Sequence, residues 1–211
     1  YVGQNAFAHK GGMHVAAVNR DPHTFEHFDP ALVGNTPHVL VSELSGRATI
    51  DQRARELGLA GADQKDLATR VLRRVKEREH LGYHYEAADA SFELLLRSET
   101  GATVEFFRLE SFRVIVEKRE DGDTVSEATV KVHVGGERFI ETAEGNGPVN
   151  ALDRALRQAI ERRFPLVHDI RLVNYSVRIL DENKGTGAKT RVLIDSSDGH
   201  GSWGSVRVDV N

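Results

Sequence analysis

The chain has 211 residues, of which 39% are hydrophobic and 28% are charged, and its formal net charge at pH 7 is -4. This composition is typical of a soluble globular protein with one large or two small domains, and no apolar run approaches the roughly 20 residues that span a membrane. The negative charge gives no general attraction to nucleic acid. The lack of cysteine excludes disulfides and thiolate catalysis and fits a reducing compartment, so we expect a cytoplasmic protein.

Glycine, histidine and proline punctuate residues 1–45, where we expect one short helix over residues 6–18 and then irregular chain. Residues 46–100 are different, because their apolar residues recur at helical spacing and predict a small helical linker subdomain. The three expected helices lie around residues 50–57, 67–81 (with Asp63 as a candidate N-cap) and 89–98 (with Asp89 near the cap and Phe92, Leu95 and Leu96 buried). Arg70, Arg73, Arg74, Lys76 and Arg78 form a basic run on the second, which we interpret as a solvated face.

Beyond Gly101 the apolar period falls to two, which predicts half-buried strands. Phe112, Val114 and Val116 mark the first strand, and Val130, Val132 and Val134 mark the second. A third strand over residues 138–143 leads through a glycine-rich loop into a helix that stops before Pro165.

The same order of elements then begins again, at offsets of about 60–64 residues. The corresponding residues are Leu109 with Leu172, Phe112 with Tyr175, Val114 with Val177, and Phe139 with Trp203. This internal repeat predicts an α+β domain over residues 101–211 that contains two βββα units, at about 105–165 and 168–211. The helix of the second unit is missing, because the chain ends at Asn211 where that helix should start. A six-stranded sheet with one covering helix would leave apolar surface open, so we expect a homodimer.

Two segments have residues suited to binding or catalysis. His14 follows Gly11-Gly12, which permits close approach of a ligand, and it could transfer protons near neutral pH, although its spacing also fits a structural histidine. Between the third strand and its helix lies a loop whose free N–H groups would favour an anion, with the alternative that Asn146 only caps the helix. This loop consists of Gly145, Asn146, Gly147, Pro148 and Val149.

A third segment, His23 to His27, matches the H-x-x-E-H pattern of zinc peptidases. Pro22 and Pro30 leave it less than two turns of helix, and no third ligand is evident. We therefore expect no metal site in this chain, and an independent zinc hydrolase is the less favoured hypothesis.

Four segments carry a recognisable pattern: NAFAHKGGMH at residues 5–14, LVGNT at 32–36, VLVSELSGR at 39–47 and EGNGPVNAL at 144–152. Together they resemble the 2-isopropylmalate synthase family. Three more, GYHYEAADASFEL at 82–94, FRVIVEK at 112–118 and VLIDSSDG at 192–199, look like the citramalate synthase branch of that family.

The resemblance implies that this chain, which opens at Tyr1 without a methionine, is the C-terminal part of a longer acyltransferase and is inactive alone. The parent would condense acetyl-CoA with a 2-oxo acid in a barrel that holds a divalent metal ion. The acceptor would be pyruvate in the citramalate branch and 2-oxoisovalerate in the isopropylmalate branch. Residues 1–45 would then form a post-barrel segment whose His14 reaches the partner subunit's active site as a candidate general base.

The same resemblance implies that residues 101–211 are a regulatory domain that dimerises and binds the end-product amino acid between its halves. N–H groups would bind the carboxylate of that effector and an acidic or carbonyl oxygen its ammonium group. Isoleucine is the first expected effector and leucine, in an isopropylmalate synthase, the second. The two side chains differ only in the placement of one methylene group, which is worth about 1–3 kcal/mol in a shaped pocket, so the sequence leaves both effectors open. The competing hypothesis is a structural dimerisation module without a ligand. By position, the effector pocket would comprise Gly145, Asn146, Gly147, Pro148, Val149, Tyr175, Ile179, Thr186, Ala188, Val208 and Asp209.

Overall fold

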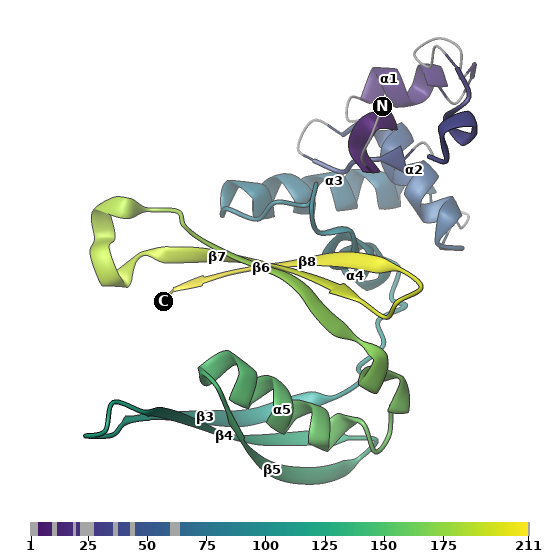
Figure 1. Ribbon diagram of the computed structural model, residues 1–211. Coiled ribbons are helices and arrows are strands. Elements are labelled where there is room, and N and C mark those ends of the chain that lie inside the picture. Colours follow the sequence, from purple (N-terminus) through teal and green to yellow (C-terminus); the bar gives the residue numbers. More distant parts are fainter. Residues whose placement is uncertain are drawn as a thin grey trace. The chain divides into compact units, whose positions relative to one another are not determined.

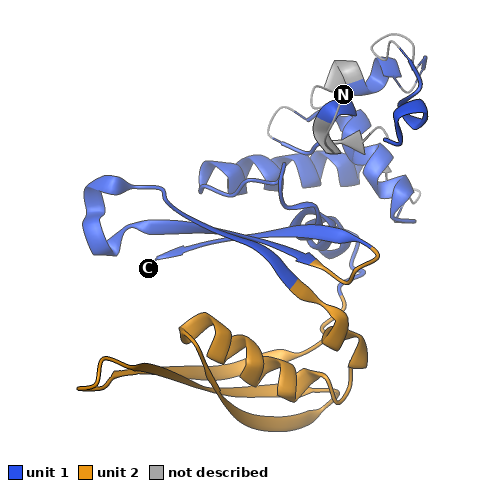
Figure 2. Cartoon of the chain, in the orientation of Figure 1, with its two compact units in different colours: residues 1–103, 172–196, 201–211 blue, residues 104–171, 197–200 orange. Residues whose placement is uncertain are grey.

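The computed structural model describes residues 4–9, 12–18, 20–21, 28–35, 38–42, 45–59 and 64–210. Figure 1 shows the helices and strands in chain order, and they confirm the predicted α+β class. The chain divides into two compact units, coloured in Figure 2. The first unit comprises residues 1–103, 172–196 and 201–211, and the second comprises residues 104–171 and 197–200.

Short elements form the N-terminal part of the first unit. They are η1 (Gln4–Phe7), β1 (Ala8–His9), α1 (Gly12–Val18), η3 (Pro30–Val33) and β2 (His38–Val39). The predicted helix over residues 6–18 is wrong in its first half, because Ala8 and His9 pair in parallel with β2 and the helix begins only at Gly12. The Asp29 carboxylate caps η3 by accepting a hydrogen bond from the Ala31 N–H at 2.9 Å.

Three helices follow as predicted: α2 (Arg47–Glu56), α3 (Gln64–His80) and α4 (Asp89–Glu99). Val71 and Val75, one helical turn apart on α3, are fully buried with Phe92 and Leu96 of α4 in one hydrophobic core. Beside them the buried Tyr85 hydroxyl accepts a hydrogen bond from Arg78. The candidate cap Asp63 lies outside the described residues.

The first unit also contains the three-stranded sheet of the second repeat, which consists of β6 (Arg171–Ile179), β7 (Lys189–Ser197) and β8 (Ser202–Val210) in that order. A short helix, η5 (Glu182–Gly187), connects β6 to β7. β8 packs against α4, and its Val206 joins the helical core. The Asp89 carboxylate accepts the Gly204 N–H at 2.7 Å and the Ser91 hydroxyl accepts the Val206 N–H at 2.9 Å. A Cβ at Gly204 would lie 2.0 Å from the Ala87 carbonyl oxygen, so the backbone just before α4 approaches this strand at a position where only glycine fits.

The second unit consists of an antiparallel sheet covered by one helix, and it corresponds to the first repeat. Its elements are β3 (Arg108–Lys118), β4 (Thr124–Val134), β5 (Glu137–Gly145), α5 (Pro148–Ile160) and η4 (Pro165–Asp169). Alternate residues of the central strand β4, from Ala128 to Val134, are buried against α5. The helix contributes Ala151, Ala155 and Ala159, whose small side chains let it lie close to the sheet.

Two expectations about the sheets are wrong. The six strands form two separate three-stranded sheets rather than one. In addition, β3 is not half-buried, because only Val114 among its residues is partly buried while Phe112 and Val116 are exposed. The described helices include none that is long and apolar enough to cross a membrane.

Candidate functional site

The loop that was expected to bind an anion joins β5 to α5 in the second unit. Gly145 ends β5, and a Cβ there would lie 2.4 Å from the Ala151 backbone nitrogen, so the loop packs directly on the start of the helix. Asn150 accepts the Asn146 N–H through Oδ1 at 3.3 Å. Arg154 donates to the Glu144 carbonyl oxygen at 2.9 Å and ties the end of β5 to the second turn of α5.

The alternative reading, in which Asn146 caps the helix, is wrong. The N-cap residue is Gly147, which has no side chain to accept a hydrogen bond, and Pro148 follows it at the first helical position. The first intrahelical bond runs from the Ala151 N–H to the Gly147 carbonyl oxygen at 2.9 Å. The N–H groups of Val149 and Asn150, which precede it, are therefore not capped by a side chain and carry the positive end of the helix dipole.

Four other predicted effector residues lie on β6 and on the connection that follows it, in the first unit. Tyr175 and Ile179 belong to β6 and are about half exposed. Thr186 is exposed within η5, whereas Ala188 is buried where β7 is about to begin. The segment from Lys184 to Gly187 forms most of η5.

Asp181 links the two ends of the connection between β6 and β7. The Asp181 carboxylate accepts the Lys189 N–H at 2.5 Å and pairs with the Lys184 ammonium at 2.9 Å. The hydrogen bond from Lys184, followed by that from the Lys189 backbone, lowers the pKa of Asp181 from its usual value. Residues near Thr186 are therefore presented on a connection that is fixed at both ends.

The last two predicted effector residues, Val208 and Asp209, lie near the end of β8. Asp209 is exposed, and its carboxylate lies 3.3 Å from the Arg207 guanidinium. β8 and β6 are the two edge strands on either side of β7, so Asp209 and Tyr175 are in the same sheet but on different strands. An exposed carboxylate at this position can accept hydrogen bonds from an ammonium group.

β3 has an uncovered apolar surface, where the sequence analysis expected a half-buried strand. Leu109 pairs with Val132 and Phe112 with Val130, so both lie on the face of the sheet that packs against α5. A β-bulge between Leu109 and Ser111 makes this possible, since residues three apart would otherwise point to opposite faces. Phe112 is 57% exposed although it lies on the core face.

The bulge residue Glu110 forms an ion-pair cluster with two neighbours. Arg138 donates to both carboxylate oxygens of Glu110, at 2.7 and 2.8 Å, and His133 lies 3.0 Å from the same group. The hydrogen bonds from Arg138, more than those from His133, lower the pKa of Glu110 to about 2. The cluster fixes the bulge, and with it the direction in which Leu109 and Phe112 point.

His14, the candidate catalytic residue, belongs to the first turn of α1. Its side chain lies outside what the structure describes. The next residue, Val15, is buried. The zinc hypothesis rests on His23, Glu26 and His27, which also lie outside the described residues. Within the described ranges, no group of three or more His, Asp or Glu side chains could hold a metal ion.

Comparisons with known proteins match both parts of the chain. Residues 86–210 match the LeuA allosteric (dimerisation) domain, and residues 1–81 match the homocitrate synthase post-HMGL domain-like family. Over the whole chain, the sequence is 54% identical to an (R)-citramalate synthase of Streptomyces coelicolor, 50% to one of Geobacter sulfurreducens and 43% to one of Aquifex aeolicus. The chain spans 40% of the length of each of these relatives.

Proposed function

We propose that this chain, which belongs to the LeuA allosteric (dimerisation) domain family, is the C-terminal regulatory region of an (R)-citramalate synthase that isoleucine inhibits. The observation that carries the proposal is the similarity of the entire chain, at 54% identity, to a protein of that name. The two three-stranded sheets that follow one another in the chain support it, since a repeated unit offers two related surfaces for an effector and a partner.

The parent protein would be an acyltransferase that condenses acetyl-CoA with pyruvate. Its divalent metal ion and its acetyl-CoA would be held by a barrel outside this chain, as the resemblance to the synthase family implies. We assign this chain one residue in the reaction, His14, which would act as a general base in the active site of the partner subunit. Replacing His14 with glutamine in the parent protein should abolish condensation without changing isoleucine binding.

The effector would be bound through three chemical features. The uncapped N–H groups at the start of α5 suit a carboxylate, because they combine hydrogen-bond donors with the positive end of a helix dipole. Asp209 is an exposed carboxylate that suits an ammonium group. The half-exposed Tyr175 and Ile179 offer apolar surface to a branched side chain.

The contacts of α4 support a route by which binding could change the linker helices. At one end, Asp89 and Ser91 hold the backbone of β8, the strand that carries Asp209. At the other end, Glu99 pairs with Arg70 and Arg74 of α3 at 3.4 and 3.3 Å. A shift of β8 would therefore be transmitted through α4 to α3, which would couple the effector site to the linker helices.

Calorimetric titration of the chain with isoleucine, leucine and valine tests the proposal. We expect saturable binding of isoleucine and at least roughly tenfold weaker binding to the Asp209→Asn variant, because a charge-assisted hydrogen bond contributes about 1.5–3 kcal/mol. Asp123→Asn removes the same charge from the turn between β3 and β4 and serves as the matched control.

The other outcomes separate the alternative functions. Selective binding of leucine would assign the chain to a 2-isopropylmalate synthase. A dimer that binds none of the three amino acids would be a structural dimerisation module, and the regulatory proposal would be wrong.

A further inference from the structure

The basic run of α3 is divided between two faces of the helix. Arg70 and Arg74 both point toward α4, where they pair with the Glu99 carboxylate. Arg73 and Lys76 lie on a different face, three residues apart. The basic run, which was expected to form one solvated face, is therefore divided. Its α4 side forms ion pairs with Glu99, and its other side is a separate cationic surface.

That second surface borders a pocket in the first unit. Five of its lining residues come from α3 at the spacing of a single helix face, and the sixth, Arg47, is the first residue of α2. The cavity volume is about 360 Å³, which falls within the range of small-molecule sites. The lining residues are Arg47, Thr69, Leu72, Arg73, Lys76 and Glu77.

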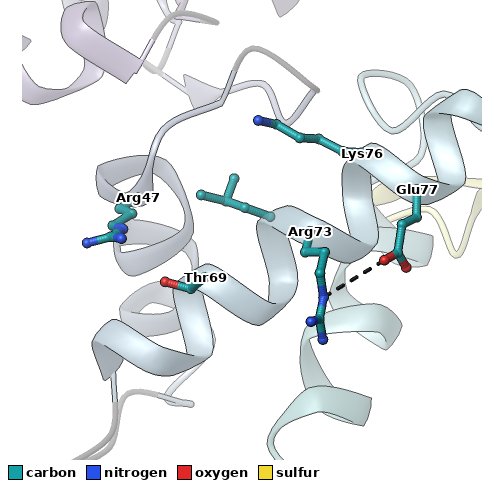
Figure 3. Close-up of a pocket in the computed structure, with 6 residues that line it drawn as sticks. Arg47, Thr69, Arg73, Lys76 and Glu77 are labelled. Atoms are coloured by element: carbon teal, nitrogen blue, oxygen red, sulfur yellow. Dashed lines mark ion pairs between the residues drawn. The ribbon is translucent and has the colours of Figure 1, made fainter.

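The charges around the pocket are not balanced, because it has three cations and one carboxylate. Figure 3 shows Arg73 turned toward Glu77, with which it pairs at 3.8 Å, while the Lys76 side chain extends toward the α2 side of the pocket. Glu77 also lies 3.7 Å from Arg74, outside the pocket. Across the described ranges, the side chains of Arg47 and Lys76 have no ion-pair or hydrogen-bond partner.

We propose that this pocket binds the phosphate groups of a phosphorylated small molecule. The planar guanidinium of Arg47 can donate two parallel hydrogen bonds to a phosphate, and the Lys76 ammonium adds a second positive charge. Leu72, which also lines the pocket, offers apolar contact to the organic part of such a ligand. An amino acid fits less well, since its ammonium would find only Glu77, which two arginines already engage.

The test is calorimetric titration of the 211-residue chain with inorganic pyrophosphate and with ADP, at constant ionic strength. The test variant is Arg47→Gln/Lys76→Gln. The matched control is Arg55→Gln/Lys118→Gln, which removes the same two charges from exposed positions outside the pocket. We expect saturable binding to the wild type and the control, and binding weakened roughly tenfold or more in the test variant.

The two probes distinguish the source of recognition. Equal affinities would show that the phosphates alone are bound, and a higher affinity for ADP would add a contact of the organic part with Leu72. The proposal is overturned if neither probe saturates, if both variants are weakened equally, or if an acidic polyglutamate peptide binds here and the phosphates do not. Isoleucine binding is measured separately, so the result does not depend on the regulatory proposal.

Discussion

Phe112→Asp should convert the dimer proposed for this domain into a monomer. Phe112 is 57% exposed on the core face of its sheet. If a phenylalanine buries roughly 200 Å², about 110 Å² of this side chain lies in water. At about 25 cal/mol per Å², covering that area contributes about 2.8 kcal/mol, and a twofold axis repeats the contact. Losing about 5.6 kcal/mol would weaken the dimer by about four orders of magnitude.

Sedimentation equilibrium of the wild-type and variant chains at micromolar concentration measures this effect. The matched control is Ile140→Asp, because Ile140 is 52% exposed but pairs with Lys131, whose side chain is on the opposite face from the core. We expect the control to dimerise like the wild type. A dimer that survives Phe112→Asp with an unchanged dissociation constant, or that is lost equally in the control, would refute this choice of face.

Three further predictions concern stability, each measured by urea unfolding of the chain. Glu110→Gln should destabilise the second unit at neutral pH, and its difference from the wild type should shrink as the pH falls from about 4.5 to about 2. The reason is that a lowered carboxylate pKa stabilises the fold fully above the unfolded value, and this stabilisation is lost as the pH falls through the folded value. A constant difference down to pH 2 would contradict the lowered pKa. Gly204→Ala should lower the free energy of unfolding by about 1–3 kcal/mol, since its Cβ would meet the Ala87 carbonyl oxygen. The control Gly201→Ala, with open space around the added Cβ, should lower it by less than about 1 kcal/mol. Equal losses would argue against the close approach of the Ala87 backbone to β8. Ser91→Ala should cost about 1 kcal/mol by leaving the Val206 N–H without its acceptor, and an unchanged unfolding midpoint would contradict that bond.

The elements of this fold were predictable where one periodicity dominated a long stretch. Val71, Val75, Phe92 and Leu96 recur at helical spacing, and the structure buries all four. The alternation of β4 likewise predicted its burial, because this central strand has a sheet neighbour on each side and α5 above it. Residues 8–9 were mispredicted as helix, since their pairing with β2 depends on a segment about 30 residues later.

The face of an edge strand was harder to predict. Phe112, Val114 and Val116 have the same alternation as the residues of β4, but α5 packs over β4 and β5, so two of the three stay exposed. Leu109 reaches the same face only through the bulge at Glu110, which the three-residue spacing between Leu109 and Phe112 could have indicated. The spacing recurs between Leu172 and Tyr175.

The positions of the candidate binding residues were predictable only in part. The loop from Gly145 to Val149 was identified from its position between a strand and a helix, and the structure places it there with an uncapped helix start. The pocket proposed to bind phosphate was not predicted, because Arg47 and Lys76 lie on different helices and 29 residues apart. A run of basic residues in the sequence does not reveal which of them are already paired.

The role of Asp89 illustrates why a correct local prediction can still give the wrong function for a side chain. An aspartate at a helix start normally stabilises its own helix, and α4 does begin at Asp89. Its carboxylate instead accepts the N–H of Gly204, a residue 115 positions away, while Ser91 binds the next N–H on the same side of β8. The one local sign of this contact is Gly204 itself, since a glycine inside a strand often marks the close approach of another backbone. The N-cap residue of α4 is Ala88, whose side chain cannot accept a hydrogen bond. The first polar side chain of α4, Asp89, therefore finds its hydrogen-bond partner on β8 and not within its own helix.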